Sequence, residues 1–279
     1  MQIDKEVIFK NDQLPIVPNN LQNLLNALSD DDLDFITLAK ILSEFPSVSA
    51  RLISVANSAW AAPKVEITHL EDACSRLGLK IVRSIAISLT VAAPFNPQKC
   101  PEFIASRFWA DALLTADIAF SLTPLINSDV HAKTIHTIGL LQSLGLLWLA
   151  DNMNEITGVV LNDSHTNDAS IAARLQQQVG THYHEIGFYL AESWGFPKVL
   201  QQSILNCSQK NYSGEFSEYA QVVYLALQIV ARLNKELEME ELVPLAETLG
   251  IQKVDFEKYC EGCYNALDSM RELANTLFR

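Results

Sequence analysis

Two cysteines near the C-terminal end have the spacing of a redox or zinc motif. They are Cys260 and Cys263, in the stretch CEGC, and such a pair can supply two thiolates to either chemistry. A structural zinc ion needs a second pair of ligands, and the neighbouring sequence offers none. Steps of four and three residues also place both cysteines on one apolar helical stripe, where cysteine packs as a small hydrophobic residue. The stripe is formed by Phe256, Cys260, Cys263, Leu267, Met270 and Ala274.

Histidines are the other candidate ligands, and their spacing is poor. His182 and His184 are two residues apart, which turns a helix by about 200° and sends the rings to nearly opposite faces. The other four are scattered along the chain: His69, His131, His136 and His165. The chain contains no G-x-G-x-x-G or G-x-x-x-x-G-K-[ST] phosphate loop and no G-x-S-x-G nucleophile elbow. We therefore expect neither a metal site nor a cofactor.

The apolar run HTIGLLQSLG, residues 136–145, carries two uncharged polar residues in its middle. Its isoleucine and leucines are spaced to face a core, and this spacing predicts one helix over 132–150. Gln142 and Ser143 interrupt that apolar face, although packing alone requires neither an amide nor a hydroxyl there. These two residues are therefore candidates for a present or a lost site.

The stretch 71–89 has the outline of a helix-turn-helix, with two short helices around a glycine. Its second helix would offer Lys80, Arg83 and Ser84 to DNA. The apolar residues between them are typical of a buried helix instead. The net charge of -13 also opposes the phosphate attraction that dominates DNA affinity. We expect no nucleic-acid partner, and a DNA-binding regulator stays as an alternative.

Composition places the chain among globular proteins. It has 279 residues, of which 49% are hydrophobic and 19% are charged, and this length allows a large buried core. The first residues are polar, which does not fit a signal peptide. No run approaches the roughly 18 apolar residues of a membrane span. Five cysteines in a chain of this length are not a disulfide framework, so we expect a cytoplasmic protein with no membrane contact.

Helical periodicity runs through nearly the whole chain, and the fold class predicted is all-α, a two-part helical bundle. The proline-rich stretch PFNPQKCPE predicts a linker between an N-terminal bundle, 14–97, and a second bundle with C-terminal helices, 98–279. The sequence THLE at 68–71 has the pattern of a capping box. After the linker, helices are predicted over 101–122, 132–150, 167–178, 182–194, 197–207, 217–234, 238–248 and 254–277.

Several blocks, in order, resemble the HDOD family, the HD-related output domain of bacterial signalling proteins. The resemblance covers about residues 14–232 and implies that the second bundle is similar to the helical core of HD domains. Phe45 stands where the family has an aspartate. The blocks are LPIVPNNLQNLLNAL, FPSVSARLISVANSAW, ITHLEDACSRLGLKIVRSIAI, RFWADALLTADIA, IGLLQSLGLLWLAD and GTHYHEIGFYLAESWGFPKVLQQSI.

The resemblance also indicates which family residues the two polar residues of GLLQSLG replace. Catalytic HD phosphohydrolases, distant relatives of the family, bind metal through a His…His-Asp…Asp set, and many HDOD sequences keep a Gly-Leu-Leu-His-Asp-x-Gly remnant. Gln142 and Ser143 occupy the His-Asp positions, and an amide and a hydroxyl are poor ligands for a transition metal. The helix that would supply the first histidine has none, and Asp111 follows its Phe-Trp pair.

Two further ligand positions of the family are altered. Its usual histidine in the later block aligns with Tyr183, between His182 and His184. Its paired histidines after the Trp-x-x-Pro helix align with Cys207 and Ser208. The resemblance therefore implies a degenerate metal site with no catalytic residue. Its vestigial pocket would either hydrogen-bond a small ligand or hold water, and would be lined by Asp111, Gln142, Ser143, Tyr183 and His184.

These observations favour a non-catalytic bacterial signal-transduction module that acts through protein–protein contacts. The resemblance implies partners from two-component or cyclic-di-GMP systems. Asn57, Ser58 and Trp60, in ANSAW, are a possible interaction motif, and the alternative is a helix cap with Trp60 in the core. A metal-dependent phosphohydrolase with unorthodox ligands is the main alternative function. The oligomeric state and any pocket ligand stay open.

Overall fold

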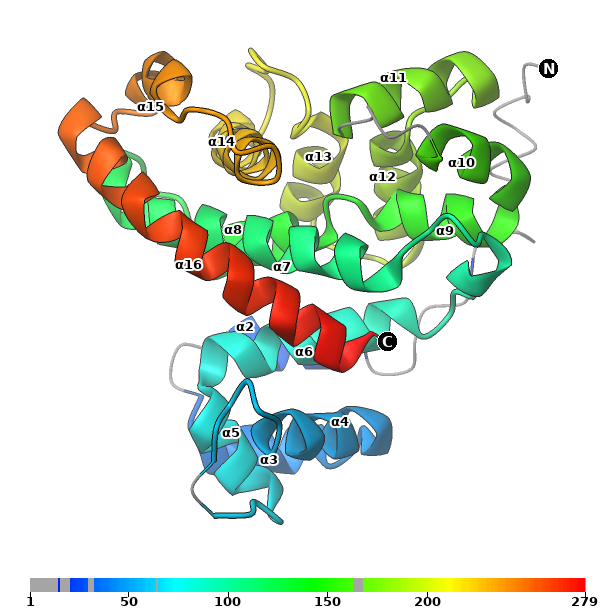
Figure 1. Cartoon of the computed structure of the whole chain (residues 1–279), viewed down its shortest axis with the longest axis vertical. Helices are drawn as coiled ribbons and strands as arrows, with labels where there is room; N and C mark the ends of the chain where they lie inside the picture. Colours follow the sequence, from blue (N-terminus) through cyan, green and yellow to red (C-terminus); the bar gives the residue numbers. More distant parts are fainter. Residues whose placement is uncertain (1–14, 16–20, 30–32, 64, 163–167, 279) are drawn as a thin grey trace.

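The structure is a computed structural model that describes residues 15, 21–29, 33–63, 65–162 and 168–278 (Figure 1). Within these ranges the chain forms α-helices and short 3-10 turns, and no strand. The all-α prediction is therefore confirmed. Leu14, the first residue of the first resembling block, lies outside the described residues, as does His165.

Helices α3, α4 and α5 form a lobe at one end of the molecule, and α2 and α6 lie between this lobe and the remaining helices (Figure 1). Asp34 caps α3 by accepting a hydrogen bond from the Thr37 amide at 2.7 Å. The predicted capping box at 68–71 is wrong, because His69 is the N-cap of α5 and no side chain caps it. These helices are α2 Leu21–Ser29, α3 Phe35–Leu42, α4 Pro46–Ala56, α5 Leu70–Leu77 and α6 Leu79–Ala92.

The remaining helices pack around α7 and α8. The predicted boundary at residue 97 falls in the 3-10 turn η1. One hydrophobic core extends through the helices on both sides of this turn, so the division into two bundles stays a prediction. The elements are η1 Pro97–Lys99, α7 Ala105–Leu122, η2 Thr123–Leu125, α8 Ala132–Leu141, α9 Leu144–Asn152, α10 Asn154–Leu161, α11 Asp168–Val179, α12 Tyr183–Ser193, α13 Lys198–Asn206, α14 Ser217–Leu233, η3 Glu240–Leu242, α15 Val243–Thr248 and α16 Lys253–Leu277.

Two differences from the sequence prediction matter for the site. The single helix predicted over 132–150 is two helices, α8 and α9, separated at Gln142 and Ser143. Helix α10 was not predicted, because the short turn at Met153 separates it from α9 without a proline or glycine. The chain therefore changes direction at the two polar residues of the apolar run.

Glycines set the closest helix crossings near this break. A Cβ atom on Gly145 of α9 would lie 2.0 Å from the carbonyl oxygen of Tyr183 and 2.7 Å from the amide nitrogen of Gly187, both on α12. A Cβ atom on Gly139 of α8 would lie 2.9 Å from the Cα atom of Ala116 on α7. The missing side chains allow backbone to approach backbone, and this brings α7, α8, α9 and α12 together.

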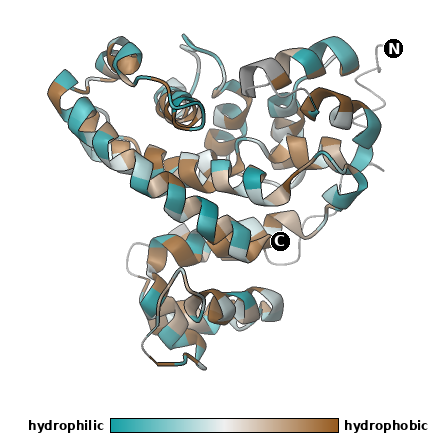
Figure 2. Ribbon diagram, in the orientation of Figure 1, coloured by the Kyte–Doolittle hydropathy of each residue, from teal (hydrophilic) through white to brown (hydrophobic). Residues whose placement is uncertain are grey.

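The long helix α16 packs along α7 with the apolar stripe that the sequence predicted. Hydrophobic and hydrophilic residues alternate along it in Figure 2. Cys260 and Cys263 are buried on this stripe as free thiols, so their packing role is confirmed. None of the described helices combines the length and the hydropathy that a bilayer crossing requires.

Candidate functional site

The break between α8 and α9 buries both polar residues of GLLQSLG. Gln142 ends α8 and is 3% exposed, while Ser143 begins α9 and is 8% exposed. The amide of Leu146 bonds to the Ser143 carbonyl, at 2.9 Å, so the new helix starts one residue after Gln142. This leaves the Gln142 carbonyl available for a partner outside the helix.

His184, in the first turn of α12, is that partner. Its ring is 1% exposed, and its Nδ1 atom lies 3.0 Å from the carbonyl oxygen of Gln142. A carbonyl only accepts, so Nδ1 carries the proton and Nε2 is the unprotonated nitrogen. Burial, together with nearby His182, lowers the pKa of His184 to about 3, against the opposing effect of the Gln142 bond. The ring is therefore neutral near pH 7.

Cys207, at the end of α13, joins the same place. Its Sγ atom lies 3.7 Å from Nδ1 of His184 and is fully buried. Ser208, the next residue, is exposed. The buried ring of Tyr183 lies against His184, with 4.2 Å between the centroids. The structure therefore joins Gln142, Tyr183 and His184 of the predicted pocket, and it adds Cys207.

Buried side-chain atoms without a hydrogen-bond partner in the described part of the chain include Oε1 of Gln142, Oγ of Ser203 on α13 and Nδ1 of His136 on α8. Ser203 lies one turn before Cys207, and sequence reasoning did not select it, because an isolated serine in a helix carries no signal of its own. Each orphan oxygen costs free energy unless water satisfies it.

Asp111 has a different set of partners. Asn234, which follows α14, donates a hydrogen bond to its Oδ1 atom at 2.9 Å, and Arg271 on α16 donates to Asn234 at 3.0 Å. Burial raises the pKa of Asp111, against the lowering effect of the Asn234 bond and of the Arg107 and Arg271 charges. The polar contacts of Asp111 are thus directed to α14 and α16, and it is a structural link there.

The available donors do not fit the HD metal centre. Among the described residues, no three or more His, Cys, Asp or Glu side chains are placed to hold a metal ion. His184 already donates through Nδ1 to the Gln142 carbonyl. Cys207 supplies one buried thiol, and a thiol with one imidazole is a poor donor set for a divalent cation. No reaction step can therefore be derived through a metal at this site.

The residues of the possible helix-turn-helix are turned inward. Arg83 and Ser84 are 6% and 4% exposed, and Ser84 Oγ lies 3.0 Å from Nε2 of buried His136. Lys80 forms an ion pair with Asp117 on α7. Helix α6 thus uses these residues to pack on α7 and α8, and they are not free to read DNA.

Asn57 and Trp60 of the possible interaction motif have partners within the chain. Asn57 ends α4, donates to the Ile67 carbonyl at 2.6 Å and accepts from the Ile67 amide at 2.8 Å. Ser58 donates to the carbonyl of Val55. Trp60 is partly buried, and its indole Nε1 lies 3.1 Å from both the carbonyl and the hydroxyl oxygen of Ser269 on α16. A role for the motif in binding a partner stays a prediction.

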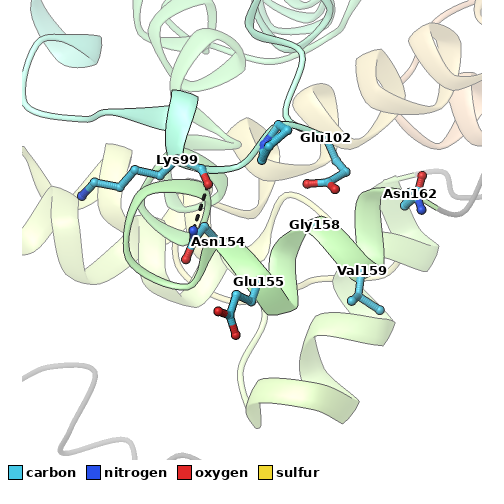
Figure 3. A pocket seen from close by; sticks show the side chains of 8 residues that line it. Lys99, Glu102, Asn154, Glu155, Gly158, Val159 and Asn162 are labelled. Carbon is cyan, nitrogen blue, oxygen red and sulfur yellow. Dashed lines mark hydrogen bonds between the residues drawn. The ribbon is translucent and has the colours of Figure 1, made fainter.

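Two surface hollows lie outside the predicted pocket. One, of about 260 Å³, is formed by the connection after η1 and by α10, where Asn154 donates to the Lys99 carbonyl at 2.9 Å (Figure 3). The other, of about 200 Å³, is formed by α2, α8 and the turn before α13. Neither hollow is lined by a residue of the predicted site, whose members Gln142, Tyr183 and His184 are buried.

The fold defines a class of protein: an all-α chain with a helical core like that of HD domains. The chain matches the HDOD domain over residues 14–210, and it therefore belongs to the HDOD family. A search of curated proteins gives no match.

Solved structures show the same fold. A protein from Marinobacter aquaeolei VT8, proposed to act in signal transduction, has a TM-score of 0.80 and 21% identity; the match covers 100% of this chain and 62% of that chain. A proposed phosphohydrolase from Shewanella amazonensis SB2B has a TM-score of 0.74 and 24% identity, covering 98% of each chain. An HDOD domain protein of unknown function from Geobacter sulfurreducens has a TM-score of 0.74 and 19% identity, covering 96% and 94%.

Proposed function

We propose that this chain is a non-catalytic signalling module of the HDOD family that acts in the cytoplasm through contacts with other proteins. The observation that carries the proposal is the state of the HD centre. At the position of the His-Asp pair, Gln142 and Ser143 form a helix break, and the nearest imidazole, His184, is hydrogen-bonded to a backbone carbonyl at 3.0 Å. Phosphohydrolysis by HD enzymes requires a water molecule activated by a bound metal ion. The residues at this position do not supply the ligands that would hold that ion.

The partners in this proposal are proteins of two-component or cyclic-di-GMP systems. Support comes from the family and from the relatives: besides the Marinobacter protein, the MmoQ response regulator from Methylococcus capsulatus shares the fold, with a TM-score of 0.53 and 24% identity. The chain spans 62% of the Marinobacter protein. The excess of acidic residues, 33 against 20 basic ones, and the inward Arg83 argue against DNA as the partner.

Hydrolysis assays test the proposal against the phosphohydrolase alternative. Purified protein is incubated with Mn²⁺, Fe²⁺, Zn²⁺ or Ni²⁺ and with p-nitrophenyl phosphate, bis-p-nitrophenyl phosphate or cyclic-di-GMP. We expect rates equal to those of protein-free buffer with each metal. Metal-stimulated hydrolysis that His184→Gln abolishes, and that the exposed-site variant His69→Gln retains, would establish an enzyme and overturn the proposal.

A further inference from the structure

Helix α16 begins after the region that matches the family and contacts both parts of the molecule. The family match ends at residue 210, while α16 spans Lys253–Leu277. Figure 1 shows it crossing α7 and ending beside the N-terminal helices. It contacts α7 along its length, and it also contacts α4 in the N-terminal lobe. A single helix thus connects the lobe to the HD-like core.

The contact with α7 is extensive and apolar. Eight residues of α16 are buried, and near its end Phe278 stacks on Trp109 of α7 with 4.8 Å between the ring centroids. Tyr259 also donates a hydrogen bond to the Ile118 carbonyl, at 3.4 Å. Because so much apolar surface is buried here, α16 stays on α7 when weaker contacts open. The buried residues are Phe256, Cys260, Cys263, Leu267, Met270, Leu273, Ala274 and Leu277.

The contact with the lobe combines packing of α4 on α16 with hydrogen bonds from Trp60, whose side chain also packs against the hydrophobic core. Nε1 of Trp60 lies 3.1 Å from both the carbonyl and the Oγ of Ser269, and both residues are partly exposed. The loop that carries Trp60 is held firmly, because the Arg76 guanidinium donates to the carbonyls of Ala61 and Ala62 and Asn57 bonds to Ile67. These bonds hold the loop that places the indole against Ser269 of α16.

Helix α6 provides the other attachment of the lobe. Lys80 pairs with Asp117 on α7, and Ser84 lies at hydrogen-bond distance from His136 on α8. These buried or partly buried contacts fix α6 to the core. Helices α3, α4 and α5 pack on α2, α6 and one another, and α4 also contacts α16, so the lobe is attached to the core on the α6 side and on the α16 side.

We propose that α16 is a releasable strap, which holds the α3–α5 lobe against the HD-like core through the Trp60–Ser269 hydrogen bond and the contact between α4 and α16. Closure of the strap fixes the lobe, and its opening lets the lobe move about α6 while α16 stays on α7. The inference stands on contacts within the chain and does not depend on the signalling function proposed above.

Hydrogen exchange followed by mass spectrometry of the full chain tests the strap. Trp60→Phe removes the indole N–H and keeps most of the ring, and the loss of this bond should speed amide exchange about 3- to 10-fold in peptides covering 46–62 and 70–77. Peptides covering 183–206, in α12 and α13, should be unchanged. Tyr264→Phe, an exposed aromatic change on the same helix, is the control and should match the unmodified protein.

Ser269→Ala is the second variant, since it removes the hydroxyl and keeps the backbone carbonyl as an acceptor. Its effect should be smaller than that of Trp60→Phe and should appear in the same lobe peptides. Unchanged lobe exchange in both variants would overturn the proposal. An equal acceleration in the lobe and in 183–206 would also overturn it, because it would show a general loss of stability. If Trp60→Phe fails to fold, the pattern for Ser269→Ala decides.

Discussion

Nδ1 of His184 lies 3.0 Å from the backbone carbonyl oxygen of Gln142. This bond joins the start of α12 to the break between α8 and α9, and it fixes the imidazole as a neutral donor. Because Nδ1 of His184 donates to this carbonyl, it is not available to a cation. The family resemblance places Gln142 where HD enzymes have a metal-ligating histidine, and its side chain is an amide. The bond is therefore a structural contact between α12 and the break that separates α8 from α9.

Buried histidines predict a pH-dependent stability. Burial is the first cause that lowers the pKa of both His136 and His184 to about 3, from an ordinary value of 6.5. The unfolded chain therefore takes up protons between pH 6.5 and about 3 that the folded chain does not. Stability from these groups is complete above pH 6.5 and falls as the pH decreases, by about 1 kcal/mol per pH unit for each histidine around pH 5.5.

Urea unfolding at pH 8.5, 7.5, 6.5 and 5.5 measures this effect. His184→Gln removes one of the two titrating rings, so the slope of unfolding free energy against pH should become shallower by about 1 kcal/mol per pH unit around pH 5.5. Between pH 7.5 and 8.5, where neither state of these rings gains a proton, the slopes of the two proteins should agree. Identical slopes around pH 5.5 would show that His184 is charged or exposed in the folded protein.

Gly145 predicts a large effect from one added methyl group. A Cβ atom there would lie 2.0 Å from the Tyr183 carbonyl oxygen, so Gly145→Ala must push α9 from α12. We expect a loss of about 3 kcal/mol or more in the unfolding free energy. Gly262 on α16 is the matched control, because an added Cβ has nothing within 4 Å. Gly262→Ala should stabilise by about 0.5–1 kcal/mol, and a similar result for both variants would contradict the crossing.

The orphan oxygen of Gln142 predicts that its amide is dispensable for stability. Gln142→Leu removes a buried Oε1 that has no partner, so the unfolding free energy should be unchanged or rise by about 1 kcal/mol. Gln201 is the comparison, since its Nε2 donates to the Phe196 carbonyl at 2.7 Å. Gln201→Leu should cost about 1 kcal/mol. A loss in Gln142→Leu larger than in Gln201→Leu would show that an ordered water or ligand binds the amide.

Much of the fold could be predicted from local patterns. The apolar stripe of α16 follows from its spacing alone, and the proline-rich stretch marks the connection that contains η1. The break at Gln142 could not be predicted in this way, because apolar residues with helical spacing continue on both sides of it. The close approach of Gly145 to α12 decides where the chain turns, and this contact is tertiary.

Only part of the site could be predicted from the sequence, because its other contacts are tertiary as well. Gln142, Tyr183 and His184 come from two blocks that the family resemblance had already aligned, and the structure places them together. Asp111 was grouped with them by its place in a block, but its partner Asn234 lies 123 residues away in the sequence. Ser203 and its unpaired hydroxyl become visible only when α13 is packed on its neighbours.

Metal content is the measurement that tests the central claim most directly. Tag-free protein, purified without a chelator, is analysed by inductively coupled plasma mass spectrometry for iron, manganese, zinc and nickel. Because the described residues include no group of three or more His, Cys, Asp or Glu that could hold a metal ion, we expect well below about one ion per ten chains. About one or two ions per chain, retained through dialysis and lost in His184→Gln, would contradict a non-catalytic module and restore the metal-dependent phosphohydrolase.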